Sequence, residues 1–274
     1  MTEDETIKTT KEGLSIVTEI MKAAGDDANV KEAAGNLGQT AVTLTKTINN
    51  IILPLAAVNF GFEKARIYFS EKFQKDITEK TENIPPEYLV QPKASVAGPT
   101  LQGLAFTHEE QNLKDMFLNL LATSMDGRKA DIAHPAFVEI IKQMDSEDAR
   151  LVQETLKSTS PIPIIEIYAN MNDGAGKTLM LRHVLNLKDT DTGEISEDPK
   201  LPAMVDNWIR LGLVTVDYNK QIVDPRYYSW AEQRPEYLNL CNTLNSESQK
   251  VEYNGGIIFR TEFGKQFAAA IALQ

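Results

Sequence analysis

The chain has 274 residues, 42% of them apolar and 24% charged, which is typical of a folded protein with room for two domains. Its net charge of −11 argues against a surface that coats nucleic acid, because phosphate binding depends on clustered Lys and Arg. The single cysteine, Cys241, cannot form an internal disulfide, and three scattered histidines offer no zinc site. We therefore expect a protein of the reducing cytoplasm without a metal.

The first sixty residues hold one expected helix and one unusual run. A helix is expected over 12–24, and the N-terminus lacks the basic-then-apolar order of a signal peptide. Residues 33–62 are rich in small side chains and threonine, and their apolar part, 51–58, is shorter than the ~20 residues that cross a bilayer. Small residues allow close helix packing, so we predict a hairpin or oligomer contact; insertion into a membrane surface is the alternative.

The next segment is predicted to be helical, then extended, then helical again. Pro54 marks the start or a kink of a helix that runs to about Lys80. Residues 84–99 carry four prolines and predict an extended connector. A short helix is expected from Pro99 to Phe106. Thr107, with Glu110 three residues later, has the spacing of a capping box for the helix that follows.

Three consecutive amphipathic helices are predicted between residues 111 and 157. The first ends at Asp126–Gly127. The second begins at Pro135, with His134 as its cap, and Asp145 or Ser146 caps the third. The expected inward-facing side chains share helical spacing: Leu113, Met116, Phe117, Leu120 and Leu121 in the first helix, Phe137, Ile140, Ile141 and Met144 in the second, and Leu151, Val152, Thr155 and Leu156 in the third.

Several segments together resemble a known family. LKDMFLNLLATSMD and HPAFVEIIKQMDSEDARLV, with the upstream segments ILPLAAVNFGFEKARIYFSEKF and IPPEYLVQPKASVAGPTLQGLAFTHEEQNL, are similar to the abortive-infection alpha (Abi-alpha) family of bacterial proteins. The resemblance covers about residues 50–155. It implies a role in defence against phage and supplies no catalytic residues.

After Ser158 the pattern changes. Residues 161–169 have the β-branched density of a strand, and the glycine-rich residues 171–177 predict a turn. A short helix is expected around Thr178–Leu185, followed by an exposed acidic loop over 188–200.

The remaining pattern resembles a winged-helix domain. Gly212 ends one expected helix, and Thr261 caps another. A long insertion is expected between the two wing strands. The expected elements are helices at 201–209 and 231–244, strands at 213–217 and 257–260, and a final helix after Thr261.

Candidate functional residues all have simpler structural explanations. The sequence GAGKT at 174–178 follows a strand, but a phosphate loop needs a glycine where Met171 stands, so we interpret it as a turn. His134 is expected to cap a helix, His108 to lie on the surface, and Cys241 to be half-buried. We therefore predict no catalytic, cofactor-binding or metal-binding residue.

The predicted winged-helix part carries few cations for a DNA-binding surface. Lys200 and Arg210 flank Asp206 on the candidate recognition helix, and the acidic loop 188–200 would repel phosphate. We therefore expect this part to bind protein or to dimerise, and we do not expect nucleic acid as a partner.

The sequence thus predicts a mainly α fold with two domains: a helical domain at 1–144 and a winged-helix-like α+β domain at 145–274. The expected function is anti-phage defence by abortive infection, without enzymatic activity, through a phage or host protein partner. Homo-oligomers and membrane-surface contact stay open. The alternatives are a membrane-perturbing effector that uses 33–62 and a winged-helix DNA-binding regulator.

Overall fold

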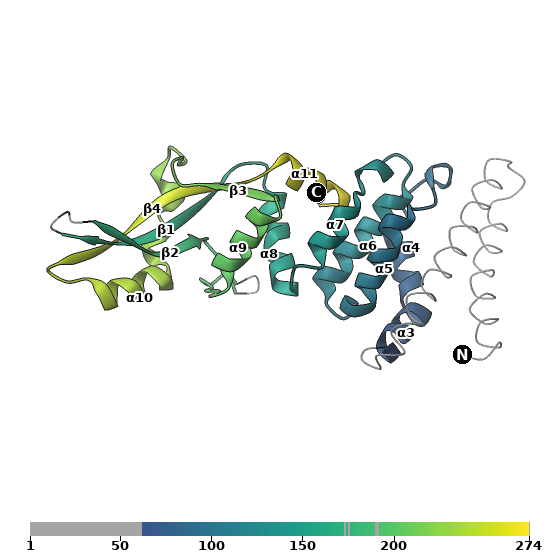
Figure 1. The fold of residues 1–274 in the computed structure, drawn as a ribbon, viewed down its shortest axis with the longest axis horizontal. Helices are drawn as coiled ribbons and strands as arrows, with labels where there is room; N and C mark the ends of the chain where they lie inside the picture. Colours follow the sequence, from purple (N-terminus) through teal and green to yellow (C-terminus); the bar gives the residue numbers. More distant parts are fainter. Residues whose placement is uncertain (1–61, 173, 175, 190–191, 274) are drawn as a thin grey trace, which may run out of the picture. The chain divides into compact units, whose positions relative to one another are not determined.

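The computed structural model describes residues 62–172, 174, 176–189 and 192–273 (Figure 1). These residues form a mixed α+β fold with two compact units. One unit contains the described residues up to Arg150 together with those from Gln266 onward, and the other contains Leu151–Lys265. The first unit therefore holds the end of the described chain as well as its beginning. The boundary between residues 144 and 145 stays a prediction.

The first unit is a packed group of helices with α6 at its centre. Helix α6 packs against α4, α5 and α7. Its ten buried residues make it the main source of apolar core in this unit. The helices that lie entirely within this unit are α3 (Phe62–Glu71), α4 (Phe73–Thr81), η1 (Pro86–Tyr88), α5 (Ala94–Thr107), α6 (Gln111–Met125), η2 (Ala130–Ile132) and α7 (Pro135–Ile141).

The helical periodicity and caps predicted for 111–157 are confirmed. The side chains predicted to face inward on α6 are buried, as are Phe137, Ile140 and Ile141 of α7. His134 Nδ1 accepts a hydrogen bond from the backbone N–H of Ala136 at 3.1 Å. Asp145 Oδ1 accepts one from Asp148 N at 2.8 Å, so Asp145, of the two candidates, caps α8. These signals are local, which explains why the sequence reveals them.

The predictions upstream of α6 hold only in part. The expected helix to Lys80 is present in its described part and ends at Thr81, but Lys72 divides it into α3 and α4. Helix α5 begins at Ala94 and continues through Pro99, because the burial of seven of its residues outweighs one lost backbone hydrogen bond. Thr107 donates to the Gly103 carbonyl at 3.0 Å and caps nothing. The helix expected at 12–24 and the run before Phe62 lie outside the described residues.

The second unit contains a four-stranded antiparallel sheet in the order β2-β1-β4-β3. Helices α8 and α11 each have residues in both units. The elements, in order, are α8 (Ser146–Lys157), β1 (Ile162–Met171), β2 (Lys177–Val184), α9 (Leu201–Arg210), β3 (Val214–Asp217), η3 (Pro225–Tyr228), η4 (Ala231–Gln233), α10 (Pro235–Leu244), β4 (Gln249–Arg260) and α11 (Glu262–Ala270).

The helix predicted around Thr178–Leu185 is wrong, because this segment forms strand β2. The glycine-rich turn predicted before it is present, and Gly174 and Gly176 both have positive φ. The turn returns the chain alongside β1, where β2 obtains hydrogen-bonding partners. An apolar run this short fits either the period of a helix or the period of a strand, and pairing with a neighbouring strand decides which structure forms.

Most other elements of this unit are confirmed, with some changes in length. The predicted strands at 161–169 and 213–217 are β1 and β3, and Thr261 Oγ1 accepts from Gly264 N at 2.8 Å as the cap of α11. The helix predicted at 231–244 is divided into η4 and α10. The strand predicted at 257–260 is the end of β4, which pairs with β3 over 257–260 and with β1 over 249–258.

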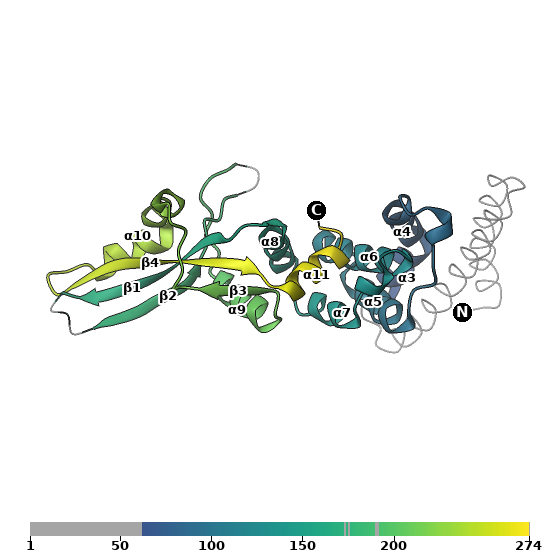
Figure 2. The same ribbon diagram turned by 90° about the horizontal axis from the view of Figure 1, so that it is seen from above.

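One face of the sheet is covered by α10 and the turns before it (Figure 2). Ile165 and Ile167 of β1 and Val251 of β4 form the centre of this apolar cluster, together with Tyr228 of η3. A Cβ at Gly255 would lie 3.0 Å from the Tyr228 ring, so the absence of a side chain there lets the ring lie against the strand. The residues that alternate with this cluster face the other side of the sheet.

Candidate functional site

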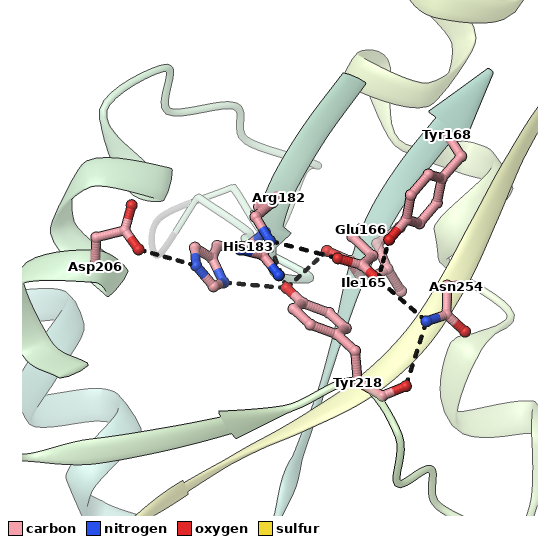
Figure 3. A network of polar contacts seen from close by, with 8 residues as sticks. All are labelled: Ile165, Glu166, Tyr168, Arg182, His183, Asp206, Tyr218 and Asn254. Atoms are coloured by element: carbon pink, nitrogen blue, oxygen red, sulfur yellow. Dashed lines mark hydrogen bonds and ion pairs between the residues drawn. The ribbon is translucent and has the colours of Figure 1, made fainter. Parts of the chain in front are cut away.

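A polar network lies on the sheet face opposite α10 (Figure 3). Its centre is Glu166 of β1, which is 3% exposed and stands between the apolar Ile165 and Ile167. Glu166 Oε1 accepts hydrogen bonds from Tyr168 Oη at 2.5 Å and from Asn254 Nδ2 at 3.2 Å. The neighbouring strand thus supplies a partner for a carboxylate that burial alone would destabilise.

The second oxygen of Glu166 faces a cation. Glu166 Oε2 has no hydrogen-bond donor, and it lies 3.4 Å from Arg182 Nε on β2. The Arg182 side chain is 54% exposed, and its guanidinium carbon is 5.7 Å from the centre of the Tyr218 ring. Arg182 therefore contacts the buried carboxylate of Glu166 at one end of its guanidinium and is partly exposed to solvent.

An irregularity of β2 positions these groups. The register between β1 and β2 shifts twice, once between Ile165 and Ile167 and once between Ile167 and Tyr168. His183 lies in the first shift with φ of +60°, a conformation that is uncommon for residues other than glycine. A bulge of this kind redirects side chains. Here Arg182 lies beside Glu166, whereas the ring of His183 contacts the hydroxyl of Tyr218 (Figure 3).

His183 connects α9 with the end of β3. Its Nε2 lies 3.3 Å from Asp206 Oδ1, and its Nδ1 lies 3.0 Å from Tyr218 Oη. Since a carboxylate can only accept, a neutral His183 carries its proton on Nε2 and accepts the Tyr218 hydroxyl proton at Nδ1. Tyr218 Oη also accepts from the His183 backbone N–H at 3.1 Å.

The surroundings of His183, Tyr218 and Tyr168 favour the uncharged form of each side chain. Burial lowers the pKa of His183, and the nearby Asp206 carboxylate only partly opposes this effect. Burial is also the main cause that raises the pKa of Tyr218 above its usual value and that of Tyr168 to about 12, the latter with help from Glu166. A phenol whose pKa is raised stays protonated, and an imidazole whose pKa is lowered is a weak base, even where it accepts the phenol proton as His183 does from Tyr218.

A glycine makes room for the network on β4. Tyr218 packs against Gly256, where an added Cβ would collide with Cδ1 of its ring. The Tyr218 carbonyl accepts from Asn254 Nδ2 at 3.3 Å. The consecutive glycines Gly255 and Gly256 therefore admit one tyrosine on each face of the same strand.

The residues singled out in the sequence are not brought together by the fold. Lys177 and Thr178 of the GAGKT segment begin a strand where a phosphate loop requires a helix, so the interpretation as a turn is confirmed. Lys177 Nζ lies 4.1 Å from the centre of the Tyr168 ring. His108 ends α5 and stacks on Tyr68 at 4.7 Å, and Cys241 is half-buried on α10.

Sequence reasoning missed Glu166, His183 and Tyr218. Two signals were present: a glutamate within the apolar strand IPIIEIYA, and a histidine within the apolar run LMLRHVL. A charged or polar side chain in such a run requires a buried partner. Tyr168 is close to Glu166 in sequence, but Asn254 is 88 residues from Glu166, and Tyr218 is 35 residues from His183.

Two other kinds of site are absent from the described residues. In the described ranges of the chain, no three His, Cys, Asp or Glu side chains are grouped so that they could hold a metal ion. None of the helices formed by these residues has both the length and the apolar character that crossing a bilayer requires.

Comparison with known proteins identifies the family. Residues 65–271 match the model of the family described as abortive infection alpha. The match begins within the segment of resemblance at 50–155, continues past the end of that segment, and includes the whole polar network. Neither the search of curated proteins nor the search of solved structures returned a match. Because the family model covers most of the sequence, this chain belongs to the abortive infection alpha family.

Proposed function

We propose that this protein protects bacteria against phage by abortive infection, and that it does so by binding a protein partner in the cytoplasm rather than by catalysis. Membership of the abortive infection alpha family supports the defence role. The observation that carries the binding role is the polar face of the sheet, where the ordered groups of Figure 3 reach solvent through Arg182. The raised pKa of Tyr218 and the lowered pKa of His183 disfavour nucleophilic catalysis there.

Phage plating tests the defence role. Bacteria that express the protein and bacteria with the empty vector are challenged with a phage panel at low and high ratios of phage to cells. Abortive infection predicts protection at the low ratio and collapse of the culture at the high ratio, because infected cells stop growing before phage mature. An unchanged plating efficiency across the panel would refute the proposed role.

We further propose that α9, β3 and the end of β4 act as a winged-helix-like module that binds protein. The antiparallel pairing of β3 with β4 after α9 supports this interpretation. DNA binding is less well supported because Arg210 is bonded to Asn207 within α9, and Asp206 adds a negative charge. Duplex DNA that bound tightly at low salt and dissociated as salt increased would favour the DNA-binding alternative.

A further inference from the structure

We infer that strand β2 is a docking site for an acidic, extended segment of a partner protein, which adds to the sheet beside β2 and places carboxylates on Lys177 and Arg182. This inference rests on the proposed protein-binding function and specifies its surface. The strand is terminal in the sheet order β2-β1-β4-β3, and in the described part of the chain only β1 pairs with it. Alternate residues of such an edge direct backbone N–H and C=O groups outward, where another strand can bind them.

The charge of this segment is opposite to that of the whole protein. Between Asp173 and Asp189 the sequence contains Lys177, Arg182 and Lys188 but no acidic residue, although the chain carries a net charge of −11. A strand of this charge favours a partner rich in Asp and Glu, since complementary charges steer association and suppress other partners.

Arg182 is held in an orientation suited to a carboxylate. Its Nε faces the buried Glu166, which Tyr168 and Asn254 hold in place. No residue described in the structure is hydrogen-bonded to the two Nη atoms of Arg182. A guanidinium anchored in this way can present its free nitrogens to a carboxylate, with less entropy lost on binding.

Apolar contact is available between the two cations. Leu179 pairs with Tyr168 on β1, and Leu179 and Met180 are 40% and 39% exposed. Lys177, whose Nζ lies over the Tyr168 ring, is exposed and forms no ion pair with any residue that the structure describes. A strand that alternates apolar and acidic side chains matches this pattern better than nucleic acid, which needs many more phosphate contacts.

Pairing of β2 with the β2 of a second copy is less favourable. In an antiparallel pair centred between Leu179 and Met180, Lys177 of each copy would stand opposite Arg182 of the other, which places like charges together. The register shifts after Leu179 also confine regular pairing to the first half of the strand. An acidic partner segment carries charges opposite to those of Lys177 and Arg182. It also lacks the bulges that a second copy of β2 would bring to the pairing.

The binding test uses the full-length protein and labelled peptides of about ten residues, the upper end of ordinary strand length. One peptide alternates Glu and Val, and the other alternates Lys and Val. We expect binding of the acidic peptide only, with affinity that falls as salt increases. The combined K177E and R182E substitutions are expected to weaken binding at least about tenfold, since two favourable charge contacts become repulsive.

Three further variants make the binding test specific. Arg226→Glu is the matched control: its side chain is 88% exposed on η3, whose Tyr228 packs on the opposite sheet face, and the expected affinity is that of the wild type. Arg182→Gln and Lys177→Gln, which introduce no repulsion, should show smaller losses. Circular dichroism and thermal unfolding establish that each variant is folded. Equal binding of both peptides, no binding of either, or full binding by the folded K177E/R182E protein would overturn the inference.

Phage plating separates this inference from the proposed function. Loss of protection by K177E/R182E, with protection retained by Arg226→Glu, supports both. Protection that survives K177E/R182E leaves defence intact and overturns the role of β2. A wild-type protein without protection counts against the proposed function, whereas the peptide measurements still decide what β2 binds. A wild-type dimer in sedimentation that K177E/R182E disrupts would replace the acidic segment with a second copy.

Discussion

The hydroxyl of Tyr218 contacts His183 twice: Oη lies 3.0 Å from the imidazole Nδ1 and 3.1 Å from the backbone nitrogen. Tyr218 thereby contacts both the ring of the histidine, whose tautomer Asp206 sets, and its backbone in the unusual conformation. Because His183 follows Arg182 directly, the same contact also fixes the strand that carries the proposed docking cation.

Tyr218→Phe is expected to lower the free energy of unfolding by about 1–2 kcal/mol, because His183 loses both an acceptor for its N–H and a donor to its Nδ1. Denaturant unfolding measures this loss. The ring remains against Gly256, so a much larger loss would show that the variant disturbs packing as well as hydrogen bonding.

The pH dependence of stability is expected to change in His183→Asn. The pKa of His183 is lowered in the folded protein, so below the ordinary value of 6.5 the unfolded chain binds more protons and the fold loses stability. Asparagine is uncharged and tolerates positive φ, so the variant should lose less stability between pH 7.5 and 5.5 than the wild type.

Asp206→Asn provides the opposite test. The Asp206 carboxylate favours the charged imidazole, so its removal should lower the pKa of His183 further and make the acid loss of stability steeper. Melting temperatures across the same pH range compare the two variants. Identical pH dependence in both would show that His183 does not contribute to it.

Gly103 and Gly98 form a matched pair on α5. A Cβ at Gly103 would lie 2.7 Å from Cε1 of Phe117, whereas one at Gly98 has nothing within 4 Å. Gly103→Ala should therefore destabilise the protein by about 1–3 kcal/mol through overpacking against α6. Gly98→Ala should change stability much less, because the helix preference of alanine is opposed by the restriction that Pro99 places on the residue before it. Thermal unfolding of both variants checks the difference in size.

Arg234 is expected to be essential for the fold of the second unit. Its side chain is fully buried, and it donates to Glu236 and to the carbonyls of Leu187 and Ser196. Arg234→Met leaves a nearly buried carboxylate without its partner, which should cost about 3–5 kcal/mol. The exposed Arg226→Met should change stability by less than about 0.5 kcal/mol. A similar loss in both variants would contradict this account.

The fold was predictable where local signals decide it. The stripe of α6, the His134 cap and the Asp145 cap depend on residues within a few positions of one another. Strand β2 was not predictable in this way, because its pairing with β1 determines its structure. The candidate site was not predictable either, because it also depends on strand pairing. Glu166 and Asn254 are far apart in sequence, and only the register of β1 against β4 places them opposite each other.

The position of α11 has a consequence for the order of folding. Phe267 and Ile271 are fully buried in the first unit, and the Phe267 ring meets that of Phe137 at 5.3 Å. During synthesis, the helices around Phe137 leave the ribosome long before these residues do, and the whole sheet unit is made in between. The core of the first unit therefore cannot be completed until the second unit has been translated. Contacts between residues so far apart in sequence form slowly.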